Sequence, residues 1–452
     1  MPRVRPQVAA RRRRVALAAL GCLLACGRPP EPGAAAAPTP APEGDARGEP
    51  APPAAAIEPT AAEQVAAAEE APAEPTPPAE LPEGYLRFAG ACDPGTTVTI
   101  AAVGDVLLHQ ELQRQAYAAK ERHLALWGGV VDLLKRADLT YANLEGPMAA
   151  GIDRKGNTVP DPGASYDRVV YTAYPRFNYH PSLAQSLVDS GVDVVSTANN
   201  HALDREAIGV DKTLDALDEV KLAHTGTRRQ GASERAPWHA ITSAGDVRVA
   251  WLACAHTTNQ IADEHHQVLH CYKDRALVLR LVRELARDPK IAAVIVTPHW
   301  GREYQTEPRK QEVKLAHELA EAGATAILGS HPHVLQPWER HTTQDGREVF
   351  IHYSLGNFAS HQPELPRRST VILYLALGVH EGRARVRGVG YVPLHVRQDG
   401  EQFFTEAIDR VDGPADSRAL TVELLGRENL LAPDAPLSLA PHCQPGHRFP
   451  AP

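Results

Sequence analysis

Six short polar motifs, each placed where a strand would end, constrain the fold of this chain most. Nearly all follow apolar, β-branched runs, such as 98–103 before the first motif, 192–197 before the third and 292–297 before the fourth. Runs that are apolar on both faces are typical of strands in the centre of a buried sheet. The motifs are Gly104-Asp105, Asn143-Leu144-Glu145, Asn199-Asn200-His201, His299-Trp300-Gly301, Ser330-His331-Pro332-His333 and Tyr353-Ser354-Leu355-Gly356-Asn357.

Helix-like segments alternate with these strands, which predicts an α/β fold. Two later strands, 369–377 and 384–392, are expected to form an antiparallel hairpin around Glu381-Gly382. In an α/β sheet the polar residues that follow the strands lie in one crevice at their carboxyl ends, where ligands bind. We therefore expect one shared site. The predicted helices cover 130–136, 182–190, 211–220, 276–287 and 310–322.

The side chains in the motifs are of the kinds that bind divalent metals. Mixed oxygen and nitrogen ligands suit Mn²⁺, Fe²⁺ or Zn²⁺. Because five or six ligands exceed the needs of one tetrahedral ion, we expect two ions about 3.5–4 Å apart, bridged by a carboxylate. His201, beside them, is expected to protonate a leaving group. The expected ligands are Asp105, Glu145, Asn200, His299, His331 and His333.

Each of these residues also has a purely structural interpretation. An aspartate after a strand often caps a helix, Asn199-Asn200 could form a turn, and His299 could be a packed core histidine. His331-Pro332-His333 is a stronger signal. Alternating imidazoles on an extended segment point the same way, and we expect the proline to keep this segment extended.

The first 82 residues differ in composition from the rest. Residues 1–26 combine arginines with a short apolar run ending in Leu23-Leu24-Ala25-Cys26, which is typical of a signal peptide with a bacterial lipobox. Cys26 is then expected to be lipidated, and an ordinary signal peptide cut nearby is the alternative. Residues 27–82, rich in Ala, Pro and Glu, are predicted to form a disordered tether of up to roughly 170 Å.

Of the six cysteines, four lie beyond residue 26. They allow three disulfide pairings in an oxidising compartment. We expect Cys254–Cys271, which would close a local loop, and Cys92–Cys443, which would tie the two ends of the domain together. Buried free thiols are the alternative.

Six segments of the chain together resemble one known family, the CapA family of capsule synthesis proteins, associated with poly-γ-glutamate capsules. The segments are GDVLLH, ADLTYANLEGP, VDVVSTANNHALD, VTPHWGREY, LGSHPHVLQPWE and HYSLGNF. That family belongs to the calcineurin-like metallophosphoesterase superfamily, so the resemblance implies a four-layer α-β-β-α sandwich with metals at the strand carboxyl ends. The resemblance covers about residues 97–360, which leads us to expect a main domain at 83–400 and a C-terminal extension at 401–452.

The resemblance also implies a role for each matching residue. Glu145 would take the place of the superfamily's bridging aspartate, and His201 would be the proton donor. The remaining ligands would be Asp105 and His333 for the first metal, and Asn200, His299 and His331 for the second.

The chain departs from the superfamily pattern at two places. Leu107 stands where a histidine usually follows the aspartate, and His109 could substitute through a turn; otherwise the first metal lacks a ligand. The segment 204–206 reads Asp-Arg-Glu where relatives tend to have Asp-Tyr-Gly, which changes the rim of the site. Weaker candidates for orienting ligands or substrate are Asn143, Glu303, Tyr304, Gln336, Glu339, Tyr353 and Asn357.

Together these features predict an exported, lipid-anchored protein on the periplasmic side of the envelope. Gly27 after Cys26 favours the outer membrane, if the cell has one. We expect a metal-dependent hydrolase acting on a capsule or envelope polymer of the poly-γ-glutamate type, with a non-catalytic scaffold or export factor as the alternative. A net charge of −8 argues against a nucleic-acid partner. A nucleotidase would need an aromatic clamp, which the few Phe and Trp residues do not suggest.

Overall fold

The computed structural model describes residues 85–443, which all belong to one compact unit. The α-helices are α1 (Gln110–Ala118), α2 (Leu124–Trp127), α3 (Val131–Leu134), α4 (Ser182–Asp189), α5 (Glu206–Glu219), α6 (Arg275–Arg287), α7 (Lys310–Ala322), α8 (Leu365–Arg368) and α9 (Ala415–Leu425). Short 3-10 helices cover Gly128–Val130, Ile408–Arg410 and Pro441–Cys443. The strands are β1 (Thr96–Val106), β2 (Leu139–Leu144), β3 (Val194–Ser196), β4 (Ala223–Thr225), β5 (His239–Ala244), β6 (Val247–Ala255), β7 (Ala293–His299), β8 (Ala326–Leu328), β9 (Trp338–Thr342), β10 (Glu348–His352), β11 (Asn357–Ala359), β12 (Ser369–His380), β13 (Arg383–Asp399) and β14 (Gln402–Ala407).

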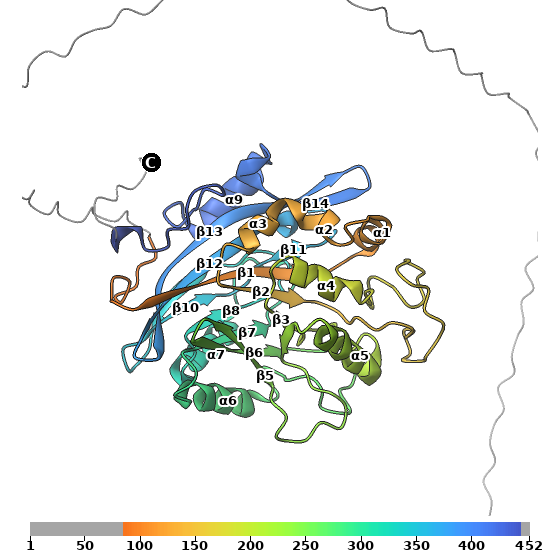
Figure 1. Cartoon of the computed structure of the whole chain (residues 1–452), viewed down its shortest axis with the longest axis horizontal. Helices are drawn as coiled ribbons and strands as arrows, with labels where there is room; N and C mark the ends of the chain where they lie inside the picture. The colour runs from red at the N-terminus through yellow and green to blue at the C-terminus, as the bar shows by residue number, and fades with distance from the viewer. Residues whose placement is uncertain (1–84, 444–452) are drawn as a thin grey trace, which may run out of the picture. The chain divides into compact units, whose positions relative to one another are not determined.

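The strands form two sheets, one of eight strands and one of six (Figure 1). The order of the larger is β14-β13-β12-β1-β2-β3-β4, with β11 also paired to β1, and that of the smaller is β5-β6-β7-β8-β10-β9. Strands β1 to β4 pair in parallel, and so do β6, β7, β8 and β10. Strands β12, β13 and β14 add antiparallel partners to the larger sheet.

The sheets stack face to face, and helices cover the outer face of each, which gives four layers (Figure 1). Three hydrophobic clusters fill the three interfaces. One lies between the larger sheet and α1 to α5, one between the two sheets, and one between the smaller sheet and the pair α6 and α7. This is the predicted four-layer α/β sandwich.

Strand β1 shows how the sequence specifies this stacking. Ile100 and Ala102 face the other sheet, whereas Ala101 and Val103 face the helices, so the side chains alternate with the two-residue period of a strand. All four are buried. Burial of a side chain the size of Ile or Val stabilises the fold by roughly 1.5–3 kcal/mol. Burial on both faces therefore fixes β1 firmly, and with it the aspartate near its end.

Most of the predicted elements occur where expected. Helices α4, α6 and α7 match the predicted ranges within one residue at each end, whereas α5 begins earlier, at Glu206. The late hairpin is formed by β12 and β13, and its turn has positive φ at Glu381 (50°) and Gly382 (76°). Two consecutive positive φ values are those of a type I′ turn, which fits the twist of antiparallel strands.

The segment expected to be a C-terminal extension contributes to the main sheet. Strand β14 pairs with β13 from Leu394↔Ala407 to Asp399↔Gln402 and forms one edge of the larger sheet. The expected boundary at 400 therefore falls in the turn between two paired strands. The predicted signal peptide at 1–26 and tether at 27–82 lie outside the described residues. Within 85–443, no helix is long and apolar enough to cross a bilayer.

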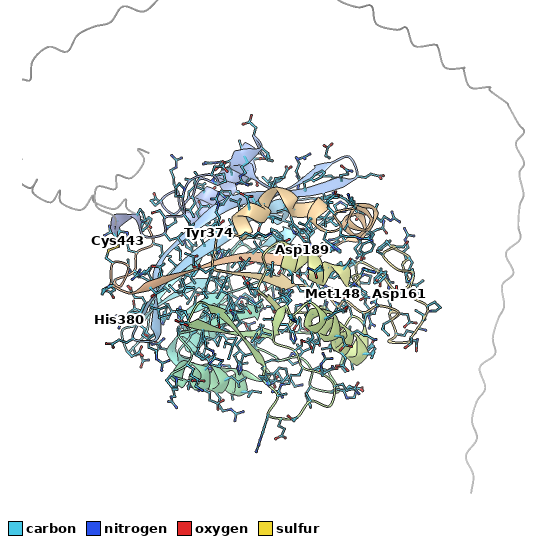
Figure 2. The ribbon with its side chains drawn as sticks, in the orientation of Figure 1. Met148, Asp161, Asp189, Tyr374, His380 and Cys443 are labelled. Atoms are coloured by element: carbon cyan, nitrogen blue, oxygen red, sulfur yellow. A yellow bond between two sulfur atoms is a disulfide. The ribbon has the colours of Figure 1, made fainter. Side chains whose placement is uncertain are left out.

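Both disulfides favoured by the sequence are present in the structure. Cys254 bonds Cys271 across a separation of 17 residues, and Cys92 bonds Cys443 across 351. Cys443 is labelled in Figure 2, at the end of the described chain. The second bond therefore closes the domain between its first and last described segments.

Candidate metal centre

The strand register brings the first polar residues together. Asp105, near the end of β1, is the direct partner of Asn143 on β2 and of Asn357 on β11. Asn143 Nδ2 donates a hydrogen bond of 2.8 Å to Asp105 Oδ1. The three side chains thus lie side by side on adjacent strands and are completely buried.

A first group of potential ligands consists of Asp105, Glu145 and His333. Their ligand atoms all lie within 4.8 Å of one another. His333 Nδ1 lies 3.1 Å from Asp105 Oδ2 and 3.0 Å from Asn357 Oδ1, and both oxygens are acceptors. Since Nδ1 must then carry the ring proton, the lone pair is on Nε2, which lies 3.8 Å from Glu145 Oε1.

A second group surrounds His299 Nε2. That nitrogen lies 2.9 Å from Asn200 Oδ1, 3.1 Å from His331 Nδ1 and 3.6 Å from Glu145 Oε1. All four atoms can carry lone pairs, and a single proton on Nε2 could satisfy only one of its neighbours. The ligand atoms of Glu145, His299 and His331 lie within 4.8 Å of one another. Glu145 is common to both groups.

Glu145 is the best indication that a cation belongs here. The residue is fully buried, and neither Oε1 nor Oε2 has a hydrogen-bond partner within residues 85–443. Burial, followed by the charges of Asp105 and Glu303, raises the pKa of Glu145 well above its usual range. A buried, uncompensated carboxylate costs several kcal/mol. The donor set of carboxylates, imidazoles and an amide oxygen fits a divalent transition metal.

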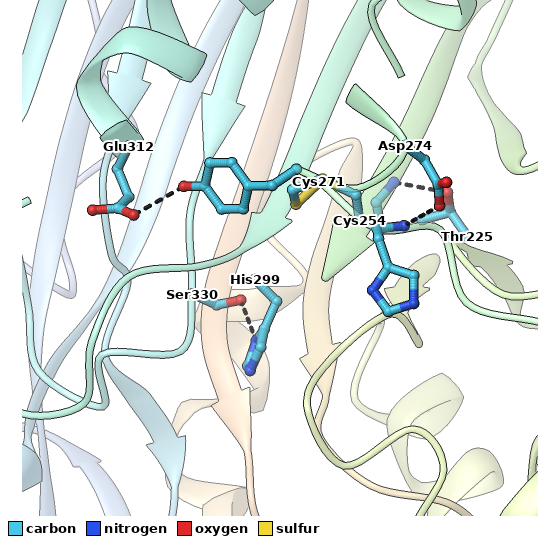
Figure 3. The surroundings of a disulfide bond; sticks show 10 residues. Thr225, Cys254, Cys271, Asp274, His299, Glu312 and Ser330 are labelled. Carbon is cyan, nitrogen blue, oxygen red and sulfur yellow. Dashed lines mark hydrogen bonds between the residues drawn. A yellow bond between two sulfur atoms is a disulfide. The ribbon is translucent and has the colours of Figure 1, made fainter. Parts of the chain in front are cut away.

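His299 is held in the orientation that a metal ligand needs. Its Nδ1 lies 3.0 Å from Ser330 Oγ, and Figure 3 shows this contact near the Cys254–Cys271 disulfide. A histidine whose second nitrogen is fixed in this way presents the other nitrogen in a defined direction. Burial and the neighbouring imidazoles His331 and His333 lower the pKa of His299 well below its usual range. The ring is therefore neutral at pH 7, as a ligand must be.

His201 forms a separate pair with Asp204 beside the two groups. Its Nδ1 lies 2.7 Å from Asp204 Oδ2, and because a carboxylate accepts, Nδ1 donates. Asp204 Oδ2 also accepts from Phe177 N at 2.6 Å, and the Phe177 ring packs against His201 edge-on at 4.7 Å. This arrangement leaves His201 Nε2 free to exchange a proton.

Three residues that shape the site were not singled out as site residues by the sequence analysis. Asn259 Nδ2 approaches His201 Nδ1 at 3.4 Å, and its Oδ1 accepts from Asn200 Nδ2 at 3.3 Å. Phe177 packs on His201, and Ser330 orients His299. Phe177 and Asn259 belong to long loops whose path is set by tertiary packing. Ser330 belongs to the motif that contains His331, so its position in the sequence could have identified it as a residue of the site.

One argument from the sequence was wrong in its geometry. His331 has φ of 100° and His333 has φ of 58°, so the segment around Pro332 is a tight loop and is not extended. Both imidazoles nevertheless reach the site, one for each ligand group. The loop turns at both histidines, and its two imidazoles each lie within 4.8 Å of Glu145 in a different group of ligand atoms.

His109 is not part of either ligand group. Its Nδ1 lies 3.2 Å from Leu107 O and accepts from His361 N at 3.2 Å. Burial, followed by the charge of His333, lowers the pKa of His109 to about 4. His109 Nδ1 therefore faces Leu107 and His361, and its substitution for the missing histidine stays a prediction.

The weaker candidates separate into three sets. Glu303 and Tyr304 are exposed at the rim, with the Tyr304 ring 6.1 Å from the His333 ring and covered by the Arg367 guanidinium at 3.5 Å. Asn143 and Asn357 contact ligands directly, as described above. The rest bond elsewhere: Gln336 donates to Gln305 O, Tyr353 donates to Glu339, and Glu339 pairs with His317.

Comparison with known proteins gives a consistent family match. A family model described as "Bacterial capsule synthesis protein PGA_cap" matches residues 99–362, more than half of the chain. "Capsule biosynthesis protein CapA" of Bacillus anthracis is 26% identical over 326 residues, which cover 69% of this chain and 71% of that protein. "PGA biosynthesis protein CapA" of Bacillus subtilis (strain 168) is 30% identical over 221 residues, which cover 48% of this chain and 50% of that protein.

Among solved structures, the NAD nucleotidase of Haemophilus influenzae aligns with a TM-score of 0.43 at 12% identity, covering 73% of this chain and 60% of that one. A sulfate thiohydrolase from a Thermus species aligns with a TM-score of 0.38 at 10% identity, covering 72% of this chain and 60% of that one.

Proposed function

This chain belongs to the bacterial capsule synthesis family whose model it matches, and from that premise we propose that it is a lipid-anchored, metal-dependent hydrolase of the cell envelope. Membership supports a role in capsule or poly-γ-glutamate synthesis. Beyond this role, we propose that the protein uses two metal ions to hydrolyse a polymer of the poly-γ-glutamate type. The bond broken is a phosphoester or an amide.

The observation that carries the proposal is the buried, unpartnered carboxylate of Glu145 between two groups of ligands. The first ion would be held by Asp105 and His333. The second would be held by Asn200, His299 and His331. Glu145 would bind both ions. Two such ions, of Mn²⁺, Fe²⁺ or Zn²⁺, would supply Lewis-acid chemistry that activates water and stabilises negative charge on the reacting group.

The chain's own residues supply the proton. As an imidazolium, His201 would donate the proton on Nε2 to the departing oxygen or nitrogen, while the Asp204 carboxylate accepts from Nδ1, stabilises the cation and fixes the ring direction. Buried walls around the pair, including Phe177, would limit competing water. At the rim, Arg367 stacks on Tyr304 and pairs with Glu364 at 2.7 Å, and the remaining face of its guanidinium would contact an anionic polymer.

Replacement of His201 by glutamine tests the proton donor. We expect turnover of a phosphodiester with a poor leaving group to fall by roughly 10²–10⁴-fold, the usual contribution of general acid catalysis. Turnover of a p-nitrophenyl ester should fall much less, because its leaving group needs no proton. Metal content should be unchanged. Equal losses on both substrates would overturn the assignment. His224→Gln is a matched control, since His224 pairs with Asp218 at 3.1 Å on the surface.

The lipid anchor has a separate test, because Cys26 lies outside the described residues. In Cys26→Ser we expect the protein to move from the membrane fraction to the soluble fraction and to lose incorporated radiolabelled fatty acid. Two acyl chains or more bind a membrane stably, whereas none would remain in the variant. The lipid anchor would be contradicted if the variant stayed in the membrane fraction and the wild type incorporated no labelled fatty acid.

One observation favours a second candidate, a non-catalytic scaffold or export factor that binds the polymer. Leu107 is buried where the superfamily has a histidine, and His109 does not reach the ligands. The first ion therefore lacks one expected ligand. A protein that binds metal and polymer but shows no turnover on any ester or amide would support this candidate instead.

A further inference from the structure

A second set of metal-binding side chains lies on the outside of the smaller sheet, between α7 and β9. His317 and Glu321 are four residues apart on α7 and so share one helix face, whereas Glu339 and His341 are two apart on β9 and share one strand face. Strand β9 is the edge strand of this sheet. None of these residues takes part in the centre at the strand ends.

The contacts bring the two faces together. His317 Nε2 lies 2.6 Å from Glu339 Oε1, and the rings of His317 and His341 stack with centroids 4.1 Å apart at 15°. His341 Nε2 lies 3.6 Å from Glu321 Oε1. The ligand atoms of His317, Glu339 and His341 are all within 4.8 Å of one another.

Neighbouring groups hold both carboxylates in place. Tyr353 OH donates to Glu339 Oε1 at 3.1 Å, and Gln344 N donates to Glu321 Oε1 at 3.1 Å. Hydrogen bonds of this kind orient carboxylates that ligate metals. His341 Nε2 is buried and has no hydrogen-bond partner in the part of the chain that the structure describes. A surface ion pair between His317 and Glu339 alone would explain neither this nitrogen nor the second stacked imidazole.

We propose that His317, Glu321, Glu339 and His341 bind one divalent transition metal ion of the zinc class. Two imidazoles and two carboxylates complete a tetrahedral shell, with ligand distances of about 2.0–2.2 Å. The side chains are 20% to 37% exposed, so small rotations suffice to close the shell. A surface groove of about 710 Å³, lined by His317, Glu321 and His341 among others, gives the ion access. The ion would fasten the edge strand to the helix.

The test uses the full chain without a histidine tag. In a background of His331→Ala with His333→Ala, which removes ligands of the strand-end centre, Zn²⁺ is titrated in competition with a chromophoric chelator. We expect about one ion per chain to remain, and the melting temperature to rise when it binds. Adding His317→Gln and His341→Asn should weaken this binding at least tenfold and abolish the rise in melting temperature.

Two further measurements keep the result clear. If the background variant does not fold, the same pair of substitutions in the wild-type chain should reduce the bound Zn²⁺ by about one ion and leave turnover unchanged. His380→Asn is the control, because His380 ends β12 away from α7 and β9 and its imidazole approaches the Glu381 carboxylate at 3.8 Å. Equal Zn²⁺ binding with and without the α7 and β9 histidines would overturn the proposal. That result would leave the strand-end centre untouched, since its ligands differ.

Discussion

Replacement of Glu145 by glutamine is expected to remove metal from the strand-end centre and to lower turnover by roughly 10³-fold, since each 1.36 kcal/mol lost from transition-state stabilisation is tenfold in rate. Glu145 is the residue common to both ligand groups, so a neutral amide at this position lowers the affinity of the protein for both ions. Metal content after purification without chelator, and hydrolysis of a phosphodiester, measure the two effects.

The same substitution should have the opposite effect on the metal-free protein. Without an ion, the Glu145 carboxylate is buried and unpartnered, and burial raises its pKa well above its usual range. An amide removes the cost of burying or protonating this carboxyl group, so the metal-free variant should melt at a higher temperature than the metal-free wild type. A chelator should therefore lower the melting temperature of the wild type by more than that of the variant.

Glu312 provides the matched control for this prediction. It is equally buried but fully partnered, because it accepts from Arg309 and from the hydroxyl of Tyr272, as Figure 3 shows for the latter. Glu312→Gln should destabilise the protein and leave its metal content intact. If Glu145→Gln behaved like Glu312→Gln in both assays, Glu145 would be a structural residue only.

Replacement of Gly104 by alanine is expected to lower the free energy of unfolding by about 4 kcal/mol or more, in the range that backbone clashes in a core produce. A Cβ at this position would lie 1.9 Å from Gly356 O and 2.8 Å from Gly356 C. Neither partner can retreat easily, because Asp105 N donates to the same oxygen at 2.9 Å. Chemical denaturation with a linear extrapolation measures the change.

Gly128→Ala serves as the control for this effect. Gly128 has helical φ and ψ of −54° and −31°, and no atom lies within 4 Å of an added Cβ. Alanine should there be neutral or stabilising by up to about 1 kcal/mol. If Gly104→Ala had the stability and metal content of the wild type, the close approach of the first and last motifs would not be a requirement of the fold.

The layers and the site were predictable because the responsible signals are local. Buried strands such as β1 and β7 have unbroken apolar runs, and the residues that follow them sit at strand ends whatever the details of packing. The same holds for Glu381-Gly382, where two adjacent residues determine the turn. These signals do not depend on tertiary contacts, and they identified the residues from Asp105 to His333 that the structure brings together as candidate ligands.

Three features could not be predicted from the sequence, because they depend on contacts between distant parts of the chain. The backbone at His331 and His333 adopts positive φ in the folded chain, which overrides the local preference that a proline imposes on the residue before it. Asn259 reaches His201 from a loop more than fifty residues away. Apolar and polar residues alternate only weakly along β9. Its place at the edge of the smaller sheet therefore follows from its pairing with β10 and not from its own sequence.

Metal content measured together with turnover shows whether the strand-end centre is that of a two-metal hydrolase. Full-length protein is purified without chelator, its metals are quantified, and hydrolysis of ester and amide substrates is followed with added Mn²⁺, Zn²⁺ or Fe²⁺, with His331→Ala plus His333→Ala as the comparison. We expect about two ions per chain at the strand ends, beyond any held between α7 and β9, together with turnover. Both the ions and the turnover should be lost in the double variant. Well-folded protein that holds no metal at the strand ends and hydrolyses nothing would contradict it.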